Sequence, residues 1–256
     1  MIATLPMYLF PETRAGYEAL WDGIRDALRD TAIDAPDALT HDIPPMDGWA
    51  APDLVLGHIC NLPYRARFRD RVTLIGAADF GLDGCGPGEY RALYVVRQDH
   101  PAETVEDLDG ATMAYSEPLS HSGWGAAATE ARAAGRRYRP TLQTGSHAGS
   151  AEAVSRGQAE FATIDAQTFR ILARHTTLTR NLRVIGATEP SPGITFITRA
   201  GQDPAPYLAA INTAISGLSP LYKENLRMIS AVSLPTSAYD LPLPPAPAPQ
   251  IGPDGP

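Results

Sequence analysis

The sequence lacks the features that would place it in a membrane or on a nucleic acid. No apolar run in its 256 residues approaches the roughly 20 residues that a membrane-spanning helix requires. Acidic residues outnumber basic ones, 29 to 21, so the formal net charge is −8. Because nucleic acids select basic surfaces, this charge argues against a DNA- or RNA-binding protein. We therefore expect a protein that is not embedded in a membrane and binds no nucleic acid.

Cysteine is scarce too, and the histidines are scattered. Cys60 and Cys85 are the only two cysteines and form no CxxC pair, and the six histidines show no HExxH or H-x3-H spacing. A metal site built on thiolates or imidazoles is therefore not indicated, and we expect neither a metal ion nor a cofactor. A Cys60–Cys85 disulfide is expected if the protein is exported, and two thiols if it stays in the cytosol.

The N-terminal stretch MIATLPMYLFPETRAG has none of the parts of an export signal. It contains no basic leading region, no long apolar stretch and no small-residue cleavage site. As written, the sequence predicts a cytoplasmic protein. A periplasmic protein is expected if an upstream signal was omitted.

The chain does contain a regular alternation of short apolar runs and amphipathic stretches. Strands are predicted at 2–6, 52–57, 71–77, 90–98, 111–116, 139–145, 159–165, 182–189 and 193–199. Helices are predicted at 17–33, 63–70, 123–134, 147–156, 166–175 and 205–218, with a short helical turn at 104–110. This alternation predicts an α/β architecture with mostly parallel sheets, which bind ligands beyond the carboxyl ends of their strands. The proline-rich end, from about 235 to 256, predicts an extended or disordered appendage.

Three strand-to-helix junctions share one design, an apolar strand followed by a loop of glycine, serine or histidine and then a helix. They read DLVLGHICNLPYRAR, MAYSEPLSHSGWGAAA and TLQTGSHAGSAEAV. The first turn of a helix carries unpaired N–H groups and a partial positive charge, so a serine there can present both its hydroxyl and those groups to an anion. Such junctions are candidates for an oxyanion site that needs no net positive charge.

Two other interpretations of the Ser-His junctions stay open. Serine is a favoured N-cap, so each junction can be a plain helix cap. A catalytic serine usually sits on a G-x-S-x-G elbow with a histidine from elsewhere, whereas GSHAG misses that spacing and SHSG has its histidine adjacent in the chain. The motifs therefore favour binding over catalysis.

Two longer stretches carry a resemblance to a known family. They are YRALYVVRQDHPAETVEDLDGATMAYSEPLSHSGW and TGSHAGSAEAVSRGQAEFATID, within about residues 50 to 200. Their order and spacing resemble the phosphonate/phosphate substrate-binding proteins of ABC transporters, with their S-T-S-G and G-S-H motifs. The resemblance implies a two-lobed type II periplasmic-binding-protein fold, with the ligand in a cleft between lobes joined by two crossover strands. Lobe 1 would be 1–91 plus 196–256, and lobe 2 would be 92–195.

The resemblance also implies site residues. In lobe 2, Ser120 and Ser122 match the serines of the S-T-S-G loop, with His121 in place of its threonine, and His147 matches the histidine of G-S-H. The remaining candidates are Tyr90, Asp165 and, from lobe 1, Tyr8, His58, Asn61 and Tyr64. Some have plainer interpretations: Tyr90 as a strand aromatic, Asp165 as a helix cap, Tyr8 as a loop-packing residue and His58 as a core histidine.

We expect this protein to bind a small oxyanion-bearing solute, such as a phosphonate or phosphate ester, for an ABC-type uptake system. The expected partners are the anionic solute and an ABC permease, and the expected state is a monomer with no enzymatic activity. Two alternatives are an enzyme on the same scaffold, with His121 or His147 as acid–base, and a cytoplasmic ligand-sensing module.

Overall fold

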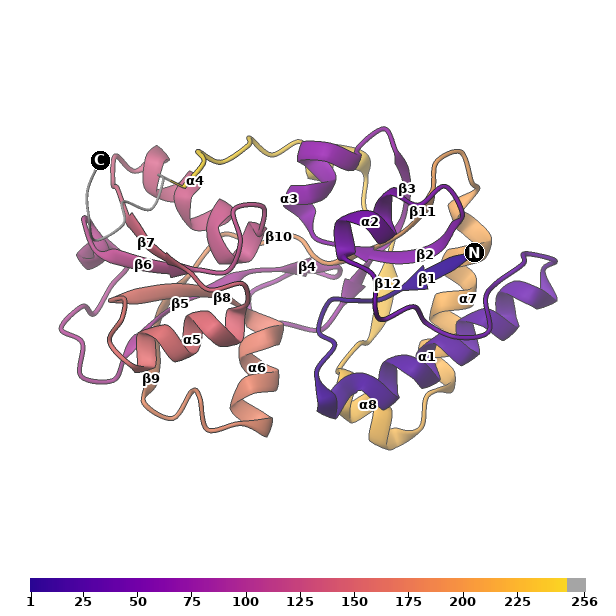
Figure 1. Ribbon diagram of the computed structural model, residues 1–256, viewed down its shortest axis with the longest axis horizontal. Coiled ribbons are helices and arrows are strands. Elements are labelled where there is room, and N and C mark those ends of the chain that lie inside the picture. The colour runs from indigo at the N-terminus through magenta and orange to yellow at the C-terminus, as the bar shows by residue number, and fades with distance from the viewer. Residues whose placement is uncertain (248–256) are drawn as a thin grey trace. The chain divides into compact units, whose positions relative to one another are not determined.

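The computed structural model describes residues 1–247, whose contacts divide them into two units (Figure 1). Unit 1 comprises Met1–Tyr90 and Pro190–Leu241, and among the described residues unit 2 comprises Arg91–Glu189 and 242–247. The sequence analysis placed the whole proline-rich end in lobe 1. The structure instead assigns its described part beyond Leu241 to unit 2. Residues 248–256 of that end lie outside the described part.

Unit 1 is built on a five-stranded sheet in the order β1-β2-β11-β3-β12. These strands are β1 (Ile2–Thr4), β2 (Leu54–Ile59), β11 (Thr195–Arg199), β3 (Val72–Asp79) and β12 (Ser230–Val232). One face carries α1 (Pro11–Asp30), α7 (Pro204–Gly217) and α8 (Pro220–Leu226), and the other carries α2 (Pro45–Ala50), α3 (Asn61–Pro63) and the π-helix η1 (Tyr64–Phe68). A two-stranded sheet pairs β4 (Glu89–Tyr90) with β10 (Ser191–Pro192), and a 3-10 turn η4 spans Thr236–Tyr239.

The helix predicted at 17–33 is α1, and the structure begins it six residues earlier. Its first residue is Pro11, a residue well suited to a first helical turn because the missing N–H would be unpaired there anyway. Leu20, Ile24 and Leu28 are buried against the rest of unit 1, as the 3.6-residue period of the sequence predicts.

Unit 2 has its own five-stranded sheet, in the order β7-β6-β8-β5-β9. The strands are β5 (Ala92–Arg97), β6 (Thr112–Tyr115), β7 (Arg139–Gln143), β8 (Phe161–Asp165) and β9 (Leu182–Ala187). The helical elements are the 3-10 turn η2 (Glu106–Leu108), the π-helix η3 (His121–Gly125), which leads directly into α4 (Ala126–Ala133), then α5 (His147–Ser155) and α6 (Ala166–His175). Its core packs residues of β5, β6 and β8 against Trp124 and the alanine face of α4.

The prediction of mostly parallel sheets is wrong. Only three strand pairs of the two five-stranded sheets are parallel, namely β1–β2, β6–β7 and β6–β8. The other pairs are antiparallel. In unit 1, β11 lies between β2 and β3 and is antiparallel to both, and β12 is antiparallel to β3. In unit 2, β5 is antiparallel to both β8 and β9. The parallel run β7-β6-β8 is the part that matters for the candidate site.

The beginning of the proline-rich end is not an appendage. Tyr239 is buried in unit 1, where its ring packs 5.2 Å from that of Tyr64 and its hydroxyl lies 2.7 Å from Thr195 Oγ1. Arg69 donates to the Tyr239 carbonyl and Arg65 to the Leu241 carbonyl. These contacts fix the chain up to the point where it leaves unit 1.

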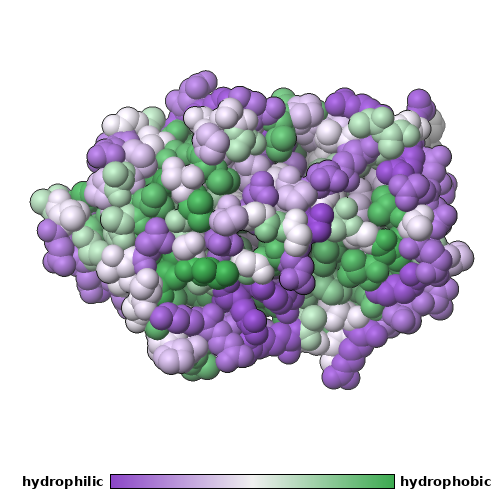
Figure 2. Space-filling view, turned by 180° about the vertical axis from the view of Figure 1, so that it is seen from behind, coloured by the Kyte–Doolittle hydropathy of each residue, from purple (hydrophilic) through white to green (hydrophobic). Residues whose placement is uncertain are grey.

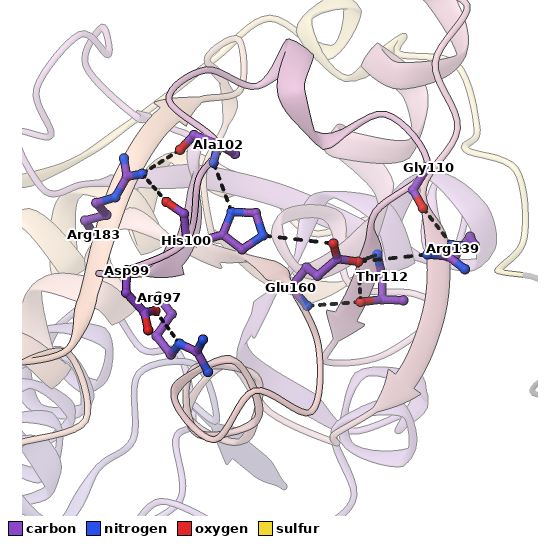
Figure 3. A network of polar contacts seen from close by, with 9 residues as sticks. All are labelled: Arg97, Asp99, His100, Ala102, Gly110, Thr112, Arg139, Glu160 and Arg183. Atoms are coloured by element: carbon purple, nitrogen blue, oxygen red, sulfur yellow. Dashed lines mark hydrogen bonds and ion pairs between the residues drawn. The ribbon is translucent and has the colours of Figure 1, made fainter.

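A polar network ties together the amino ends of the parallel strands of unit 2 (Figure 3). The Glu160 carboxylate, just before β8, accepts hydrogen bonds from the backbone N–H and the hydroxyl of Thr112, the first residue of β6, at 2.7 and 2.8 Å. These bonds hold the pKa of Glu160 below its usual value. His100 Nε2 and Arg139, which begins β7, each lie 4.0 Å from the same carboxylate. The polar groups at the amino ends of these strands are thus paired with one another within the chain. The carboxyl ends of the strands are the edge at which a ligand can bind.

No helix among residues 1–247 is long and apolar enough to cross a membrane. On the face drawn in Figure 2, hydrophobic side chains gather in separate patches interrupted by hydrophilic ones.

His58 lies in the core of unit 1, although the sequence analysis placed it in a loop. Strand β2 continues through Ile59, so His58 is a strand residue paired with Phe196 of β11. Its fully buried ring packs 4.3 Å from the ring of Phe196 and 5.8 Å from that of Tyr17, and neither ring nitrogen has a hydrogen-bond partner among the described residues. Burial lowers the pKa of His58 to about 3, so the ring is neutral at pH 7.

This burial predicts a loss of stability in acid. Since the folded-state pKa of His58 is below its unfolded value of 6.5, the unfolded chain takes up the proton first, and stability present above pH 6.5 is lost as the pH falls toward 3. The contribution is about 1.4 kcal/mol of unfolding free energy per pH unit. His58→Leu should remove it, as measured by urea unfolding at pH 7, 6, 5 and 4.

Phe196→Leu is the matched control. It shortens the side chain that packs against the imidazole but keeps the imidazole itself, so its unfolding free energy should be lower than that of the parent protein and show the same dependence on pH. If the unfolding free energy of His58→Leu instead depends on pH as that of the parent does, the His58 ring takes up its proton equally readily in the folded and the unfolded protein, which would contradict the lowered pKa.

Candidate functional site

The candidate site lies at the carboxyl edge of the parallel strands β7, β6 and β8. Because parallel strands end at the same edge of a sheet, the segments that follow them are brought together. Ser116 follows β6, Thr144 follows β7 and Asp165 ends β8. Both Ser-His junctions therefore start from one edge.

The first junction is a helix start in which Ser120 is the N-cap. Its hydroxyl oxygen accepts a hydrogen bond from Gly123 N at 3.0 Å, and its carbonyl accepts from Gly125 N at 3.0 Å, a bond across five residues. The helix thus opens with a wide π-type turn, a geometry frequent at functional sites. His121 and Ser122 lie in this turn, and both are buried.

The second junction is the start of α5, where Ser146 is the N-cap. Its hydroxyl oxygen accepts from Gly149 N at 3.0 Å. The plain interpretation of both junctions, helix capping, is therefore correct for Ser120 and Ser146. Capping uses only the hydroxyl oxygen of each serine as an acceptor, so the hydroxyl proton can still be donated to another group.

A hydrogen bond between side chains joins the two helix starts. Ser122 Oγ lies 3.0 Å from His147 Nε2, although the residues are 25 positions apart in the sequence. The starts of two helices, each with a positive end of its dipole, are thereby held side by side. The sequence predicted both helix starts, and the structure shows that they meet.

His147 is neutral at pH 7 in this arrangement. Burial of its ring lowers its pKa to about 4, and the nearby backbone of Thr163 offsets only part of that effect. A neutral imidazole has one donor and one acceptor nitrogen, so His147 brings no positive charge of its own to the site. The helix starts contribute a partial positive charge there.

Ser116 belongs to the same edge, and the sequence analysis did not single it out. It is buried, and its Oγ has no hydrogen-bond partner among residues 1–247. A Cβ added at Gly123 would lie 2.0 Å from this oxygen and 2.8 Å from Ser120 Oγ. Glycine at 123 is therefore what lets the hydroxyls of Ser116 and Ser120 approach the helix start. The sequence signal that could have identified Ser116 is its position directly after β6, which pairs with β7 in parallel.

Asp165 also serves as a helix cap. Its Oδ1 accepts from Thr168 N at 2.9 Å at the start of α6, and its backbone pairs with Ala92. The cap interpretation of the sequence analysis is therefore correct, and a ligand role for Asp165 stays a prediction.

Among the unit 1 candidates, Tyr8 is the most unusual. Its φ of 61° lies in the left-handed region that bulky residues rarely adopt. Its ring packs edge-on 5.1 Å from that of Phe80, and its carbonyl accepts from Thr13 Oγ1 at 2.6 Å. The loop after β1 is thus held in a strained conformation by its neighbours.

Two more unit 1 candidates have structural contacts of their own. Asn61 is buried, its side chain donating to the Pro192 carbonyl at 3.2 Å and accepting from Arg65 Nε at 2.5 Å. Tyr64 lies in η1, within the helix predicted at 63–70, and it packs in the core of unit 1, where burial raises its pKa.

Tyr90 and the two cysteines complete the candidate list. Tyr90 is buried in β4, with its hydroxyl 3.7 Å from Cys60 Sγ. Cys60 and Cys85 both carry thiols, so the expected disulfide is not formed in the structure. Cys60 is instead a buried neighbour of the candidate tyrosine.

The close approach at Gly123 gives a direct test of the serine cluster. Gly123→Ala should displace the start of η3, because Ser116 Cβ is also only 3.1 Å from the added methyl and rotation of one hydroxyl cannot relieve the clash. We expect a loss of about 1–3 kcal/mol in unfolding free energy, measured by urea denaturation.

Gly217→Ala, at the end of α7, is the control, since a Cβ there meets nothing within 4 Å. Its unfolding free energy should stay within about 0.5 kcal/mol of the parent or rise slightly. Equal effects of the two substitutions would contradict the tight packing around Gly123.

Comparison with protein families gives one match. The sequence model of the family described as "ABC transporter, phosphonate, periplasmic substrate-binding protein" matches residues 56–234, more than half of the chain. No curated protein matches the sequence.

Several solved structures share the fold. PhnD1 from Prochlorococcus marinus, in complex with methylphosphonate, has a TM-score of 0.68 at 13% identity, covering 94% of both chains. A binding protein component of an ABC phosphonate transporter from Pseudomonas aeruginosa has a TM-score of 0.65 at 16% identity, covering 93% of this chain and 83% of that one. XAC2383 from Xanthomonas citri, bound to chloride ion, has a TM-score of 0.67 at 17% identity, covering 93% of both chains. The predicted α/β periplasmic-binding-protein fold is confirmed by these likenesses.

Proposed function

Because this chain belongs to the family of periplasmic substrate-binding proteins of phosphonate ABC transporters, we propose that it binds a small oxyanion-bearing solute, a phosphonate or a phosphate ester. It would do so as the substrate-binding component of an uptake system, delivering the solute to a membrane permease from the periplasm. The proposed activity is reversible binding, without turnover.

The hydrogen bond between Ser122 and His147 is the observation that carries the proposal. It holds two helix starts together at the carboxyl edge of β6 and β7, so their N–H groups and serine hydroxyls can converge on one ligand. A protein with a net charge of −8 needs such local donors to attract an anion. Ser120, Ser122 and the first N–H groups of η3 would hold the anionic head, and Ser116 would add a buried hydroxyl.

His147 couples anion binding to a proton. In the neutral ring, Nε2 either accepts from Ser122 or donates to it, and in the first case the Ser122 proton is occupied. Once the ring is protonated, Nε2 can only donate, and the Ser122 O–H turns to the anion. The anion therefore favours the protonated ring, both by its charge and by this rearrangement.

Residues of unit 1 and the far end of the ligand complete the proposal. Tyr8, Asn61 and Tyr90 are proposed to contact the solute, and Asp165 to meet its cationic or hydroxyl end. His58 and Tyr64 are not carried forward, because both are packed in the core of unit 1.

The proposed anion site predicts that its serines are essential. Ser120→Ala with Ser122→Ala should weaken methylphosphonate binding at least about a hundredfold, since each lost hydrogen bond to a charged group costs about 1.5–3 kcal/mol. At about 100 times its dissociation constant, the solute should stabilise the parent protein by about 2.7 kcal/mol and the double variant hardly at all. Thermal-shift measurements over a series of phosphonates and phosphate esters check this.

Ser219→Ala is the matched control, because Ser219 also caps a helix, accepting from Tyr222 N in unit 1. It should lower the midpoint of the free protein by a similar amount and leave the ligand-induced shift unchanged. Full affinity in the double serine variant would contradict the helix-start site. A parent protein that responds to none of the anions would contradict the proposed function itself.

The coupling predicts a shift in the titration of His147. In the free protein its NMR resonances should titrate with a midpoint near 4, and with saturating methylphosphonate the midpoint should rise by at least about one pH unit. His100, which lies in the network at the opposite ends of the strands, serves as the internal control, and its resonances should not move when the solute is added at constant pH. An unchanged His147 midpoint would contradict contact between this ring and the anion.

A further inference from the structure

Unit 2 contains a cavity beside α4 that the proposed anion site does not use. Its volume is about 470 Å³, within the range of small-molecule binding sites. It is lined by one side of η3 and α4, by the turn and the beginning of β7 that follow, and by Pro245 and Ala246. We call it the α4 cavity. None of the serines and histidines of the candidate site lines it, so a ligand there is independent of the proposed solute.

Three arginines line the α4 cavity. They are Arg132, Arg136 and Arg137, and among residues 1–247 no aspartate or glutamate lines it. The three belong to the stretch RAAGRRYR, residues 132–139, which has four arginines and no acidic residue in a chain of net charge −8. A local excess of positive charge on an otherwise acidic protein favours an anionic ligand.

Two of the three guanidinium groups have no partner among residues 1–247. Arg136 donates to Glu106 Oε1 at 2.6 Å, whereas the guanidinium groups of Arg132 and Arg137 make no hydrogen bond or ion pair with the described chain. The Asp109 carboxylate accepts from the backbone N–H of Arg137, at 2.9 Å, and not from its side chain. Because Arg132 and Arg137 are exposed, their forked donors can turn to the oxygens of a bound phosphate.

Capping of α4 does not account for these arginines. The helix ends in a Schellman motif, in which Arg136 N donates to the Ala131 carbonyl at 2.7 Å. Gly135 N donates to the Arg132 carbonyl at 3.2 Å, and Gly135 has the left-handed φ of 71° that this motif needs. The backbone therefore satisfies these carbonyls without the side chains of Arg132 and Arg137. The helix end carries about half a negative charge, which two whole positive charges outweigh.

A second wall of the α4 cavity is apolar. Trp124, Ala128 and Ala131 are spaced by four and three residues, so they lie on one side of the continuous helix η3–α4. The indole N–H of Trp124 already donates to the Pro245 carbonyl at 2.8 Å, and the buried Tyr138 lines the same cavity. This wall offers apolar and aromatic surface, which suits a planar, uncharged part of a ligand.

We infer that the α4 cavity binds a small aromatic phosphate, a molecule with a phosphate group attached to a planar ring. Arg132 and Arg137 hold the phosphate, and Arg136, fixed by Glu106, adds to the positive potential. The ring packs on the wall formed by Trp124 and the two alanines. A bare inorganic anion would leave that apolar wall unused, so the ring is part of what the cavity recognises.

The test titrates phenyl phosphate into the double serine variant, in which the proposed solute site is removed. The NMR resonance of the Trp124 indole N–H should shift in a saturable manner, because this indole lines the cavity. The indole resonances of Trp21 and Trp49, which are buried in unit 1, should not move. The result stands whether or not the parent protein binds methylphosphonate, so failure of this inference and failure of the proposed function are distinguishable.

The arginines are tested by substitution in that same variant. Arg132→Gln with Arg137→Gln should weaken the binding of phenyl phosphate at least about tenfold, because two charge-assisted donors are lost. Arg67→Gln with Arg180→Gln is the matched control, since both side chains are exposed, have no partner among residues 1–247 and do not line the cavity. The control should change binding by less than about twofold. Equal weakening by the two pairs would reduce the effect to net charge and overturn the inference.

Gly135 allows a test that leaves the arginines in place. A Cβ added there meets nothing within 4 Å, so a side chain extends into open space at the cavity. Asparagine and aspartate both tolerate the left-handed backbone, so Gly135→Asn and Gly135→Asp should fold alike. Gly135→Asp should bind phenyl phosphate at least about threefold more weakly than Gly135→Asn, since only aspartate adds negative charge beside the arginines. Equal binding by the two variants would contradict an anion at this place.

Inorganic phosphate and phenol separate the two parts of the ligand. Each should bind the double serine variant at least about tenfold more weakly than phenyl phosphate, because one lacks the ring and the other lacks the charge. Three outcomes would overturn the inference: no saturable shift of the Trp124 resonance with millimolar phenyl phosphate, inorganic phosphate binding as tightly as phenyl phosphate, or phenol binding as tightly.

Discussion

The parallel alignment of β7, β6 and β8 is the constraint on which the candidate site depends. The unit 2 sheet also contains β5, which is antiparallel to its neighbours β8 and β9. Because β7, β6 and β8 run in the same direction, the loops that follow them start at the same edge of the sheet. Without that alignment, the serines after β6 and the histidine after β7 would lie at opposite ends of the unit. The contact between Ser122 and His147 therefore depends first on the direction of the strands and only then on the chemistry of the two side chains.

The opposite edge of the same strands shows how the sheet separates stability from binding. There the Glu160 carboxylate accepts a hydrogen bond from Thr112 and lies 4.0 Å from both His100 and Arg139, while Arg183 donates to the His100 carbonyl (Figure 3). At the carboxyl edge the polar groups include serine hydroxyls and a neutral imidazole, which can donate hydrogen bonds to a ligand. At the amino edge the polar groups are paired with one another, whereas at the carboxyl edge they retain hydrogen-bond donors that a ligand can use.

The α/β class and both helix starts could be predicted from the sequence because they rest on local signals, whereas the two-lobed fold was expected from the family resemblance. Apolar periodicity placed α1 and α6, and the capping preference of serine placed the starts of η3 and α5. The antiparallel course of β11 could not be predicted, since it follows from where the chain returns to unit 1 and not from its own residues. His58 and Tyr64 were misplaced for a related reason: a polar residue next to a turn motif resembles a site residue until its neighbours are known. Ser116 was missed because it becomes prominent only when Gly123 is folded against it.

Trp124 gives the molecule a built-in optical probe. The chain has three tryptophans, and two of them, Trp21 and Trp49, are buried in unit 1. The third lies two positions from Ser122, packs on Tyr115 and donates its indole proton to the backbone of residue 245. Indole emission depends on the polarity and hydrogen bonding around the ring, so the fluorescence of this one residue reports on the helix start and on the proline-rich end together. Changes in either can be followed in the unlabelled protein.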